Sequence, residues 1–84
     1  MANYKITFKK SVSKDFKSIP KSDVIKILKK IDSLAIDPRH VGCIKLSEQN
    51  NYRVRQGLFR IVYEIRDFEL VVQVIKIGHR SDVY

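Results

Sequence analysis

The chain has 84 residues, of which 44% are hydrophobic, and a formal net charge of +8. This length allows one domain, spanning residues 1–84, with a single core, and it excludes a second domain. Because a large positive charge attracts polyanions, nucleic acid is the leading class of partner, ahead of an acidic membrane surface or an acidic protein. No segment approaches the roughly 20 apolar residues that cross a bilayer, so no membrane contact is expected.

Cysteine and histidine are scarce. Cys43 is the one cysteine, so an internal disulfide is excluded, and a reducing cytoplasm is the expected location. Two histidines, one cysteine and scattered carboxylates show no spacing typical of a metal site. We therefore expect neither a metal nor another cofactor.

The N-terminal third predicts a strand and a short helix. Tyr4, Ile6 and Phe8 alternate with polar residues, which is the period of a half-buried strand. Ser11 is expected to cap the helix, and Pro20 prevents it from continuing.

A second helix is predicted directly after Pro20. Ser22 or Asp23 is expected to cap it, and Asp37-Pro38 to close it, since the residue before a proline is pushed out of helical geometry. Its apolar residues recur at steps of three and four and form one stripe: Val24, Ile27, Leu28, Ile31, Leu34 and Ala35.

The second half of the chain predicts a run of strands. A loop with one short extended piece at Cys43 to Leu46 precedes three strands, at about Tyr52–Gln56, Phe59–Arg66 and Leu70–Ile77. Their short links require antiparallel neighbours, and the last strand, apolar on both faces, should lie inside the sheet. The predicted fold is α+β in the order β-α-α-β-β-β, with two N-terminal helices packed on one face of a four-stranded, mainly antiparallel sheet.

The two kinds of basic residue occupy different parts of the chain. Nine of the eleven lysines precede residue 31, whereas five of the six arginines lie at or after Arg53. Arg53 and Arg55 share one face of their strand, and the next turn should bring Arg60 close to Arg55. Antiparallel pairing of the last two strands should also bring Arg80 towards Arg60, so the sequence predicts a phosphate-binding cluster of guanidinium groups.

Ordinary structural roles compete with this interpretation. Arginines on an open sheet face are often solvated or held in weak ion pairs, which is the role expected of Arg66 beside Glu64 or Glu69. A lone histidine such as His79 is more often structural than catalytic, although an imidazole near a basic cluster can titrate near neutral pH. A terminal Tyr84 would normally fray.

The C-terminal pattern resembles the RelE/ParE superfamily of bacterial and archaeal toxins, and its RelE branch in particular. The resemblance extends from Tyr4 to Tyr84 and includes the two helices. It rests on Tyr52-Arg-Val-Arg, on Phe59-Arg-Ile-Val-Tyr-Glu-Ile, and on Ile77-Gly-His-Arg followed by Asp82-Val-Tyr84. The sequence ends at Tyr84, so we expect it to lack the helix that follows in some relatives.

RelE-type toxins are endoribonucleases that enter the ribosomal A site and cut the codon displayed there. The resemblance therefore implies the toxin of a type II toxin–antitoxin system, with the ribosome, mRNA and a cognate antitoxin as partners, and a hetero-oligomer with the antitoxin. The implied chemistry is metal-free: the ribose 2′-OH attacks the adjacent phosphate, the 5′-oxygen leaves, and a 2′,3′-cyclic phosphate forms.

The resemblance also implies catalytic roles by position. Arg60 and Arg80 fall on arginines that stabilise the charged transition state. Tyr84 falls on a tyrosine that stacks on or orients the nucleotide and assists proton transfer. His79 takes a position where relatives carry lysine or histidine, which implies a role as acid or base.

For RNA binding, the resemblance places Arg53 and Arg55 where basic side chains hold the mRNA backbone, and Lys45 is assigned to the same set. One alternative is a ParE-like toxin that inhibits DNA gyrase by binding it, without chemistry of its own. Another is a basic RNA-binding module, for which Phe59, Tyr63 and Phe68 stand at apolar-strand or turn positions rather than in a stacking platform.

Overall fold

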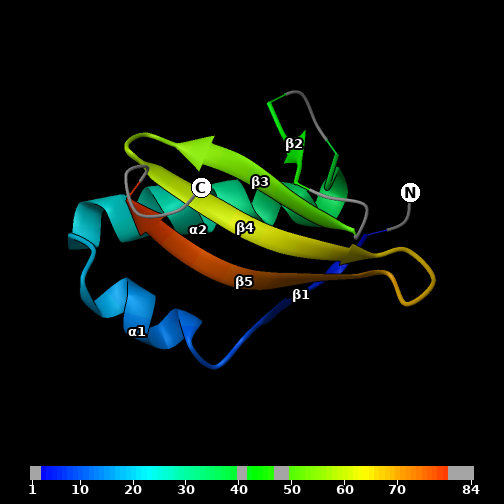
Figure 1. Ribbon diagram of the computed structural model, residues 1–84, viewed down its shortest axis with the longest axis horizontal. Coiled ribbons are helices and arrows are strands. Elements are labelled where there is room, and N and C mark those ends of the chain that lie inside the picture. Colours follow the sequence, from blue (N-terminus) through cyan, green and yellow to red (C-terminus); the bar gives the residue numbers. More distant parts are fainter. Residues whose placement is uncertain (1–2, 40–41, 47–49, 80–84) are drawn as a thin grey trace.

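Two helices cover one face of a sheet in the computed structural model, which describes residues 3–39, 42–46 and 50–79 (Figure 1). The elements follow one another as β1 (Lys5–Phe8), α1 (Val12–Lys17), α2 (Lys21–Ile36), β2 (Ile44–Lys45), β3 (Asn51–Gln56), β4 (Phe59–Arg66) and β5 (Val71–His79). In space the strands have the order β1-β5-β4-β3-β2, with β1 parallel to β5 and the other pairs antiparallel. The predicted α+β class and the interior position of the last long strand are confirmed.

The predicted count of four strands is wrong, because the described residues form five. The additional strand is β2, which lies within the extended piece expected between Cys43 and Leu46 and pairs Ile44 with Arg53 and Lys45 with Tyr52. Two residues give too short a pattern for sequence periodicity to separate a strand from a loop.

Pro20 lies between the two helices, as predicted, but it also takes the N-cap position of α2, which the sequence did not indicate. Ser11 takes the N-cap position of α1, but its side chain makes no capping hydrogen bond. The predicted caps of α2, Ser22 and Asp23, are wrong, since Pro20 holds the N-cap position and both residues lie in the first turn. The proline backbone is extended, with φ −55° and ψ 143°, and its carbonyl accepts hydrogen bonds from the N–H groups of Asp23 and Val24. Pro20 therefore starts α2, two residues after Ser18 caps the C-terminus of α1.

The core lies between α2 and the sheet. The buried face of α2 presents Ile27, Ile31 and Leu34, in agreement with the predicted stripe, while Leu28 is 39% exposed at its margin. Inward residues of the three long strands complete the core: Tyr52, Val54, Ile61, Tyr63, Ile65, Val72, Val74 and Ile77. None of the described helices is long and apolar enough to cross a membrane.

A β-bulge in β5 changes which residues face the core. Val62 pairs with Lys76 and Tyr63 pairs with Val74, so Ile75 has no partner on β4. Before the bulge Val72 and Val74 are buried, and after it Ile77 is buried, three residues further on. Since side chains alternate along a strand, the extra residue exchanges the two faces for the rest of β5.

The hairpin between β3 and β4 consists of Gly57 and Leu58. Gly57 has a φ of +61°, and a positive φ at the first of two linking residues favours glycine and matches the twist of the strands. This turn sets Arg55 directly opposite Arg60.

Candidate nucleic-acid interface

Three arginines gather on the sheet face turned away from the helices. Arg53 and Arg55 lie on β3 and Arg60 on β4, each out of phase with the residues of its strand that belong to the core between the sheet and α2. With Gly42 and Ile44 they line a hollow of about 280 Å³, here termed the arginine pocket. The predicted approach of Arg55 and Arg60 is confirmed by their cross-strand pairing.

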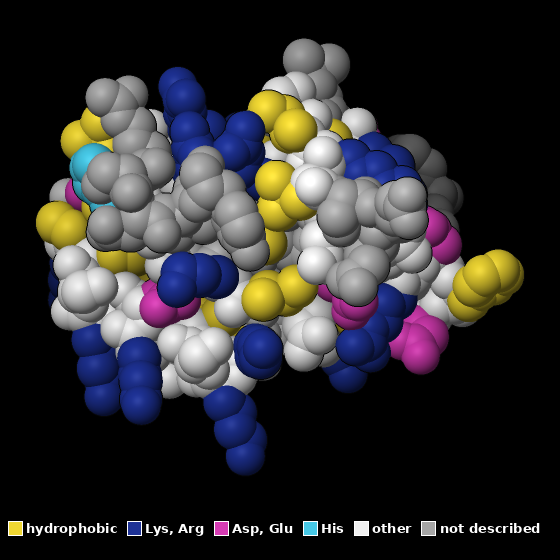
Figure 2. Space-filling view, viewed as in Figure 1, with side chains coloured by type: hydrophobic (Ala, Val, Ile, Leu, Met, Phe, Trp, Pro, Cys, Tyr) yellow, Lys and Arg dark blue, Asp and Glu magenta, His cyan; other side chains and the backbone are white. Residues whose placement is uncertain are grey.

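The arginine pocket has the chemistry of an anion site. Its lining, among the residues that the structure describes, contains three guanidinium groups and no carboxylate. A guanidinium donates two parallel hydrogen bonds to a phosphate, and Gly78, paired with Arg60 on the neighbouring strand, adds no side chain that would obstruct access. Figure 2 shows basic side chains gathered on this face over the end of β3, with others along the edge near α1.

Arg53 and Arg60 are both half-buried, whereas Arg55 is exposed. Each of the two half-buried arginines also has a further interaction within the protein. Positioned donors act more strongly on developing charge than freely moving ones, because no reorganisation is required during the reaction.

The other predicted site residues lie elsewhere or outside the described part of the chain. Lys45 pairs with Tyr52, whose ring faces the core, so Lys45 stands on the face of β2 opposite to Ile44 and does not line the pocket. Arg80 and Tyr84 lie outside the described residues.

His79 lies on the helix side of the sheet. It pairs with Phe59, and the two rings meet edge to face with centroids 5.9 Å apart. Its surroundings include Asp15 and Ser18 of the α1 region in a separate hollow of about 400 Å³. Asp15 there accepts a hydrogen bond from the backbone N–H of Ile77 at 3.1 Å, so α1 is tied to the end of β5. Among the described residues, His79 therefore lines a different hollow from the one lined by the arginines.

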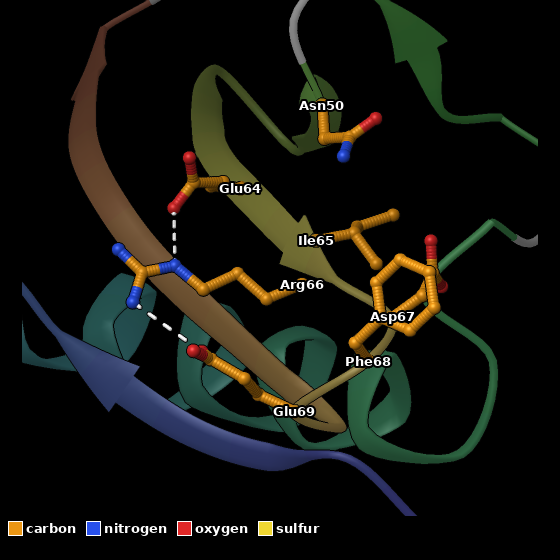
Figure 3. A pocket seen from close by; sticks show the side chains of 7 residues that line it. All are labelled: Asn50, Glu64, Ile65, Arg66, Asp67, Phe68 and Glu69. Atoms are coloured by element: carbon orange, nitrogen blue, oxygen red, sulfur yellow. Dashed lines mark hydrogen bonds and ion pairs between the residues drawn. The ribbon is translucent and has the colours of Figure 1, made fainter.

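A hollow of about 260 Å³ at the opposite end of the sheet has different chemistry (Figure 3). Arg66 lies between two glutamates there, 2.7 Å from Glu64 and 3.5 Å from Glu69. The ion pairs expected of Arg66 are confirmed. Because carboxylates already engage this guanidinium, the hollow does not attract an anion as the arginine pocket does.

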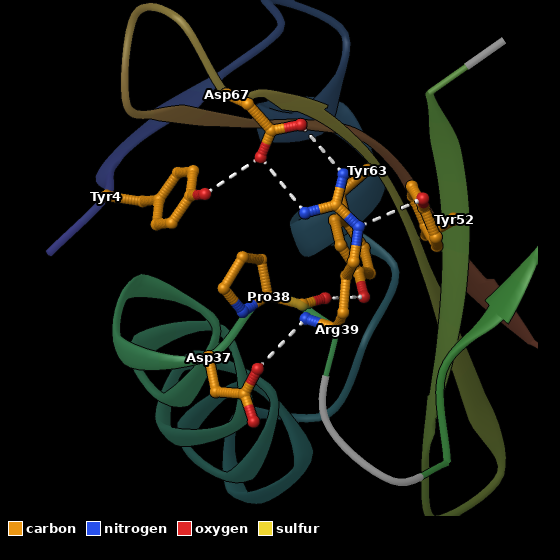
Figure 4. Close-up of polar contacts among 7 residues, drawn as sticks. All are labelled: Tyr4, Asp37, Pro38, Arg39, Tyr52, Tyr63 and Asp67. Atoms are coloured by element: carbon orange, nitrogen blue, oxygen red, sulfur yellow. Dashed lines mark hydrogen bonds and ion pairs between the residues drawn. The ribbon is translucent and has the colours of Figure 1, made fainter. Parts of the chain in front are cut away.

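A polar network around Arg39 joins the loop after α2 to the β4–β5 turn (Figure 4). The Arg39 guanidinium donates to both carboxylate oxygens of Asp67, at 3.0 and 2.8 Å, and its Nε donates to the Tyr52 hydroxyl at 3.1 Å. Tyr4 donates to Asp67 at 2.8 Å, and the buried Tyr63 hydroxyl donates to the Pro38 carbonyl at 2.7 Å. In the sequence, Arg39 precedes Gly42 and Ile44 of the arginine pocket by three and five residues.

The network shifts the pKa values of its members in ways that stabilise the ion pair. Hydrogen bonds from Arg39, and then from Tyr4, lower the pKa of Asp67 to about 2. The hydrogen bond to Asp67 raises the pKa of Arg39, and burial is the main cause that raises the pKa of Tyr63. These groups keep their ordinary charge states throughout the neutral range.

The sequence did not indicate Arg39, Gly42 or Ile44 as parts of the site region. Arg39 stands alone after Pro38, without a periodic pattern that could place it near Asp67, 28 residues later. The alternation within Cys43 to Leu46 was the one signal that could have placed Ile44 on a sheet face. Among the described residues, no group of three or more His, Cys, Asp or Glu side chains is arranged to hold a metal ion.

Comparisons with known proteins agree with this fold. Residues 6–84 match the family model of the ParE toxin of the type II toxin–antitoxin system, parDE. A RelE-like toxin protein of Escherichia coli is 28% identical over 86 residues, which cover 96% of this chain and 90% of that relative.

Solved structures give the same result. The archaeal RelE–RelB complex from Pyrococcus horikoshii has a TM-score of 0.82 at 27% identity and covers 99% of this chain and 100% of that one. The RelBE2 toxin–antitoxin complex of Mycobacterium tuberculosis has a TM-score of 0.83 at 24% identity, covering 98% and 97%. The isolated RelE toxin of E. coli has a TM-score of 0.80 at 22% identity, covering 90% and 83%. The last two likenesses concern the fold alone.

Proposed function

Because the chain belongs to the ParE toxin family of type II toxin–antitoxin systems, within the RelE/ParE superfamily, we propose that it is a toxin that cuts mRNA on the ribosome. The observation that carries the proposal is the arginine pocket, with Arg53, Arg55 and Arg60 on one open sheet face. A gyrase inhibitor that acts by binding alone has no need of three guanidinium groups around one hollow. An RNA-cleaving toxin uses them both to bind the RNA backbone and to stabilise charge at the reacting phosphate.

The proposed reaction is an internal transfer of the phosphoryl group. The 2′-oxygen attacks the adjacent phosphorus while its proton passes to a base, and the bond from phosphorus to the 5′-oxygen breaks as that oxygen takes up a proton. The products are a 2′,3′-cyclic phosphate and a 5′-hydroxyl. Negative charge grows on the phosphoryl oxygens in the transition state, so preorganised guanidinium donors lower the barrier.

Arg60 is proposed to bind the reacting phosphate, and Arg53 and Arg55 the flanking backbone. Arg80 and Tyr84 remain proposed catalytic residues on the resemblance described above. His79 has less support as the base, since its ring packs against Phe59 on the helix side of the sheet. Few side chains near the arginine pocket are acids or bases, which is consistent with a requirement for the ribosome to align the substrate.

A cognate antitoxin is the proposed regulatory partner. The Pyrococcus horikoshii relative was solved as a RelE–RelB complex, and the Mycobacterium tuberculosis neighbour as a toxin–antitoxin complex. We propose that this chain forms the corresponding hetero-oligomer, in which the antitoxin restrains the toxin.

Gyrase inhibition is the second candidate, and one observation favours it: the matching family model carries the name of the ParE toxin. Primer extension across cellular mRNAs after brief induction separates the two functions. Cuts within translated codons that disappear in an Arg60→Ala variant are expected. Intact mRNA together with inhibited gyrase supercoiling in vitro would contradict the proposal and establish the alternative.

A further inference from the structure

A second basic hollow lies between α2 and the end of β3. Three lysines of α2, together with Ser33 and Gln56, line about 310 Å³ of space, here termed the lysine groove: Lys26, Lys29, Lys30, Ser33 and Gln56. The spacing of the lysines, three and four residues apart, sets their side chains on one face of the helix. Every described side chain that lines the groove is polar, and none of these is aromatic.

Nothing within the described part of the chain neutralises these lysines. Asp23 and Asp32 each stand three residues from a groove lysine, at Lys26 and Lys29, yet no ion pair joins them. The ion pairs among the described residues all belong to arginines instead. Like charges at this spacing destabilise a helix, so a bound polyanion would offset a repulsion that the fold leaves in place.

The lysine groove and the arginine pocket meet at the same edge of the sheet but on opposite faces. Arg55 lines the arginine pocket, and the next residue, Gln56, lines the lysine groove. β2 pairs with β3 at Tyr52 and Arg53, so the edge of β3 beyond these residues has no neighbouring strand within the described residues. A ligand in one hollow therefore leaves the other open to a second ligand.

We propose that the lysine groove binds the phosphate backbone of a helical RNA segment, separate from the single strand in the arginine pocket. The inference rests on the proposed function and deepens it, because a ribosome presents helical RNA next to the mRNA that is cut. Single-strand sites characteristically stack bases on aromatic rings, which this groove lacks, whereas lysine binds phosphate as a point charge without reading bases. A protein partner fits less well, since interface cores are depleted of lysine and need apolar anchors.

The test measures binding of the full-length chain to a 20-base-pair RNA duplex and to a single-stranded, non-cleavable 2′-O-methyl oligonucleotide across a salt series. A Lys26→Gln/Lys29→Gln/Lys30→Gln variant should bind the duplex on the order of tenfold more weakly at moderate salt. The slope of log affinity against log salt should be smaller in magnitude by about two to three for this variant. Each phosphate contact that is lost reduces the number of counterions released on binding. Binding of the single strand should be almost unchanged.

The matched control is a Lys5→Gln/Lys9→Gln/Lys10→Gln variant, which loses the same charge at the β1 edge of the sheet. It should retain most of the duplex affinity. An Arg53→Ala/Arg55→Ala variant should show the opposite result. It should lose affinity for the single strand and retain its affinity for the duplex.

Equal loss of duplex binding in the groove variant and the lysine control would overturn the proposal, because net charge would then explain the effect. Unchanged duplex binding in the groove variant would overturn it as well, and so would a loss confined to antitoxin binding, which would make the groove a protein-binding surface. The readout is independent of RNA cleavage. A chain that cuts no mRNA but shows the groove-dependent duplex binding would therefore contradict the proposed function and leave the groove assignment standing.

Discussion

Arg60 is the residue on which the proposed chemistry depends most, since it lines the arginine pocket and faces Arg55 across the ladder. We expect Arg60→Ala to slow single-turnover cleavage on programmed ribosomes by about 10²–10³, the loss typical of one preorganised donor. Stability should change by less than about 0.5 kcal/mol, because the side chain lies on the open face of the sheet.

Arg66→Ala is the matched control for Arg60. It removes a guanidinium from the same strand, but one that is engaged by Glu64 and Glu69 at the other end of the sheet. Cleavage by this variant should stay near the wild-type rate. Equal cleavage rates for wild type and Arg60→Ala would show that Arg60 takes no part in the reaction.

Tyr84 is tested through a graded series. If its ring stacks on the base next to the cut, Tyr84→Phe should keep substrate placement and slow the reaction through loss of the hydroxyl. Tyr84→Ala should also lose stacking, worth roughly 1–3 kcal/mol. Single-turnover rates should therefore fall in the order wild type, Phe, Ala. Three identical rates would show that the tyrosine neither stacks nor takes part in proton transfer.

The sequence predicted the positions of some site residues and not of others, for physical reasons. The convergence of Arg55 and Arg60 could be predicted because a two-residue hairpin fixes the register of the strands it joins. The face occupied by His79 could not, because it depends on a bulge seventeen residues after the end of that hairpin and on no local pattern. Arg39 escaped detection because its partner Asp67 is distant in the sequence.

At the scale of elements, the polar network joins three segments: the β1 region, the loop after α2 and the β4–β5 turn. Tyr4 and Arg39 converge on Asp67, and Tyr63 fixes Pro38 from within the core. Leu70 ends the β4–β5 turn with a φ of +54°, a left-handed conformation that is unfavourable for a non-glycine residue. Its carbonyl accepts a hydrogen bond from the Lys5 N–H at 2.7 Å, so the strained turn and β1 support each other.

Asp67 should make stability depend on acid pH. Its folded pKa of about 2 lies below its ordinary value of 3.8, so its contribution is complete above about pH 5 and is lost as pH falls through 3.8 towards 2. Asp67→Asn should lower the free energy of unfolding at pH 7 by roughly 1 kcal/mol and no more, because the pair is exposed to water. Urea unfolding at pH 7, 4 and 2.5 measures both effects.

Glu69→Gln provides the comparison for Asp67. Glu69 forms a longer and more exposed ion pair, 3.5 Å from Arg66. The difference in stability between wild type and Asp67→Asn should shrink at pH 2.5, whereas the Glu69→Gln difference should be small at every pH. A constant deficit of Asp67→Asn across this range would mean that its cost comes from packing and not from the carboxylate charge.

The helices and strands themselves were largely predictable, because apolar periodicity extends over many residues in α2 and in β3 to β5. The exceptions are short or local. Pro20 replaced Ser22 and Asp23 at the start of α2, since the fixed φ of proline already supplies the extended entry to the helix. In β1, Phe8 is 45% exposed despite the alternation, and packs beside Phe16 with ring centroids 6.4 Å apart.

At the scale of the whole molecule, one small core supports the fold, and no disulfide can add to it. Ile31→Ala should cost about 2–5 kcal/mol, because Ile31 is 1% exposed between α2 and the sheet. Domains of this kind have only about 5–15 kcal/mol of stability, so the urea midpoint should fall by a large fraction. Circular dichroism during urea titration measures the shift.

Ile25→Ala is the control for the core. It removes the same atoms from the same helix at a position that is 52% exposed. Its midpoint should stay close to that of the wild type. Similar losses of stability in the two variants would mean that helix propensity, and not burial against the sheet, is the cause.

The bulge at Ile75 has a consequence for how this fold can vary. Successive side chains of a strand point to opposite faces of the sheet. One surplus residue therefore changes the face on which every later residue of the sequence lies. Deleting Ile75 would remove the surplus residue and the bulge together: Lys76 would follow Val74 in regular alternation, so Ile77 and His79 would stay on the helix side and Gly78 on the face of the arginines. A single-codon deletion should thus make β5 regular while leaving the cross-strand partners of Arg60 and of the buried Ile61 unchanged.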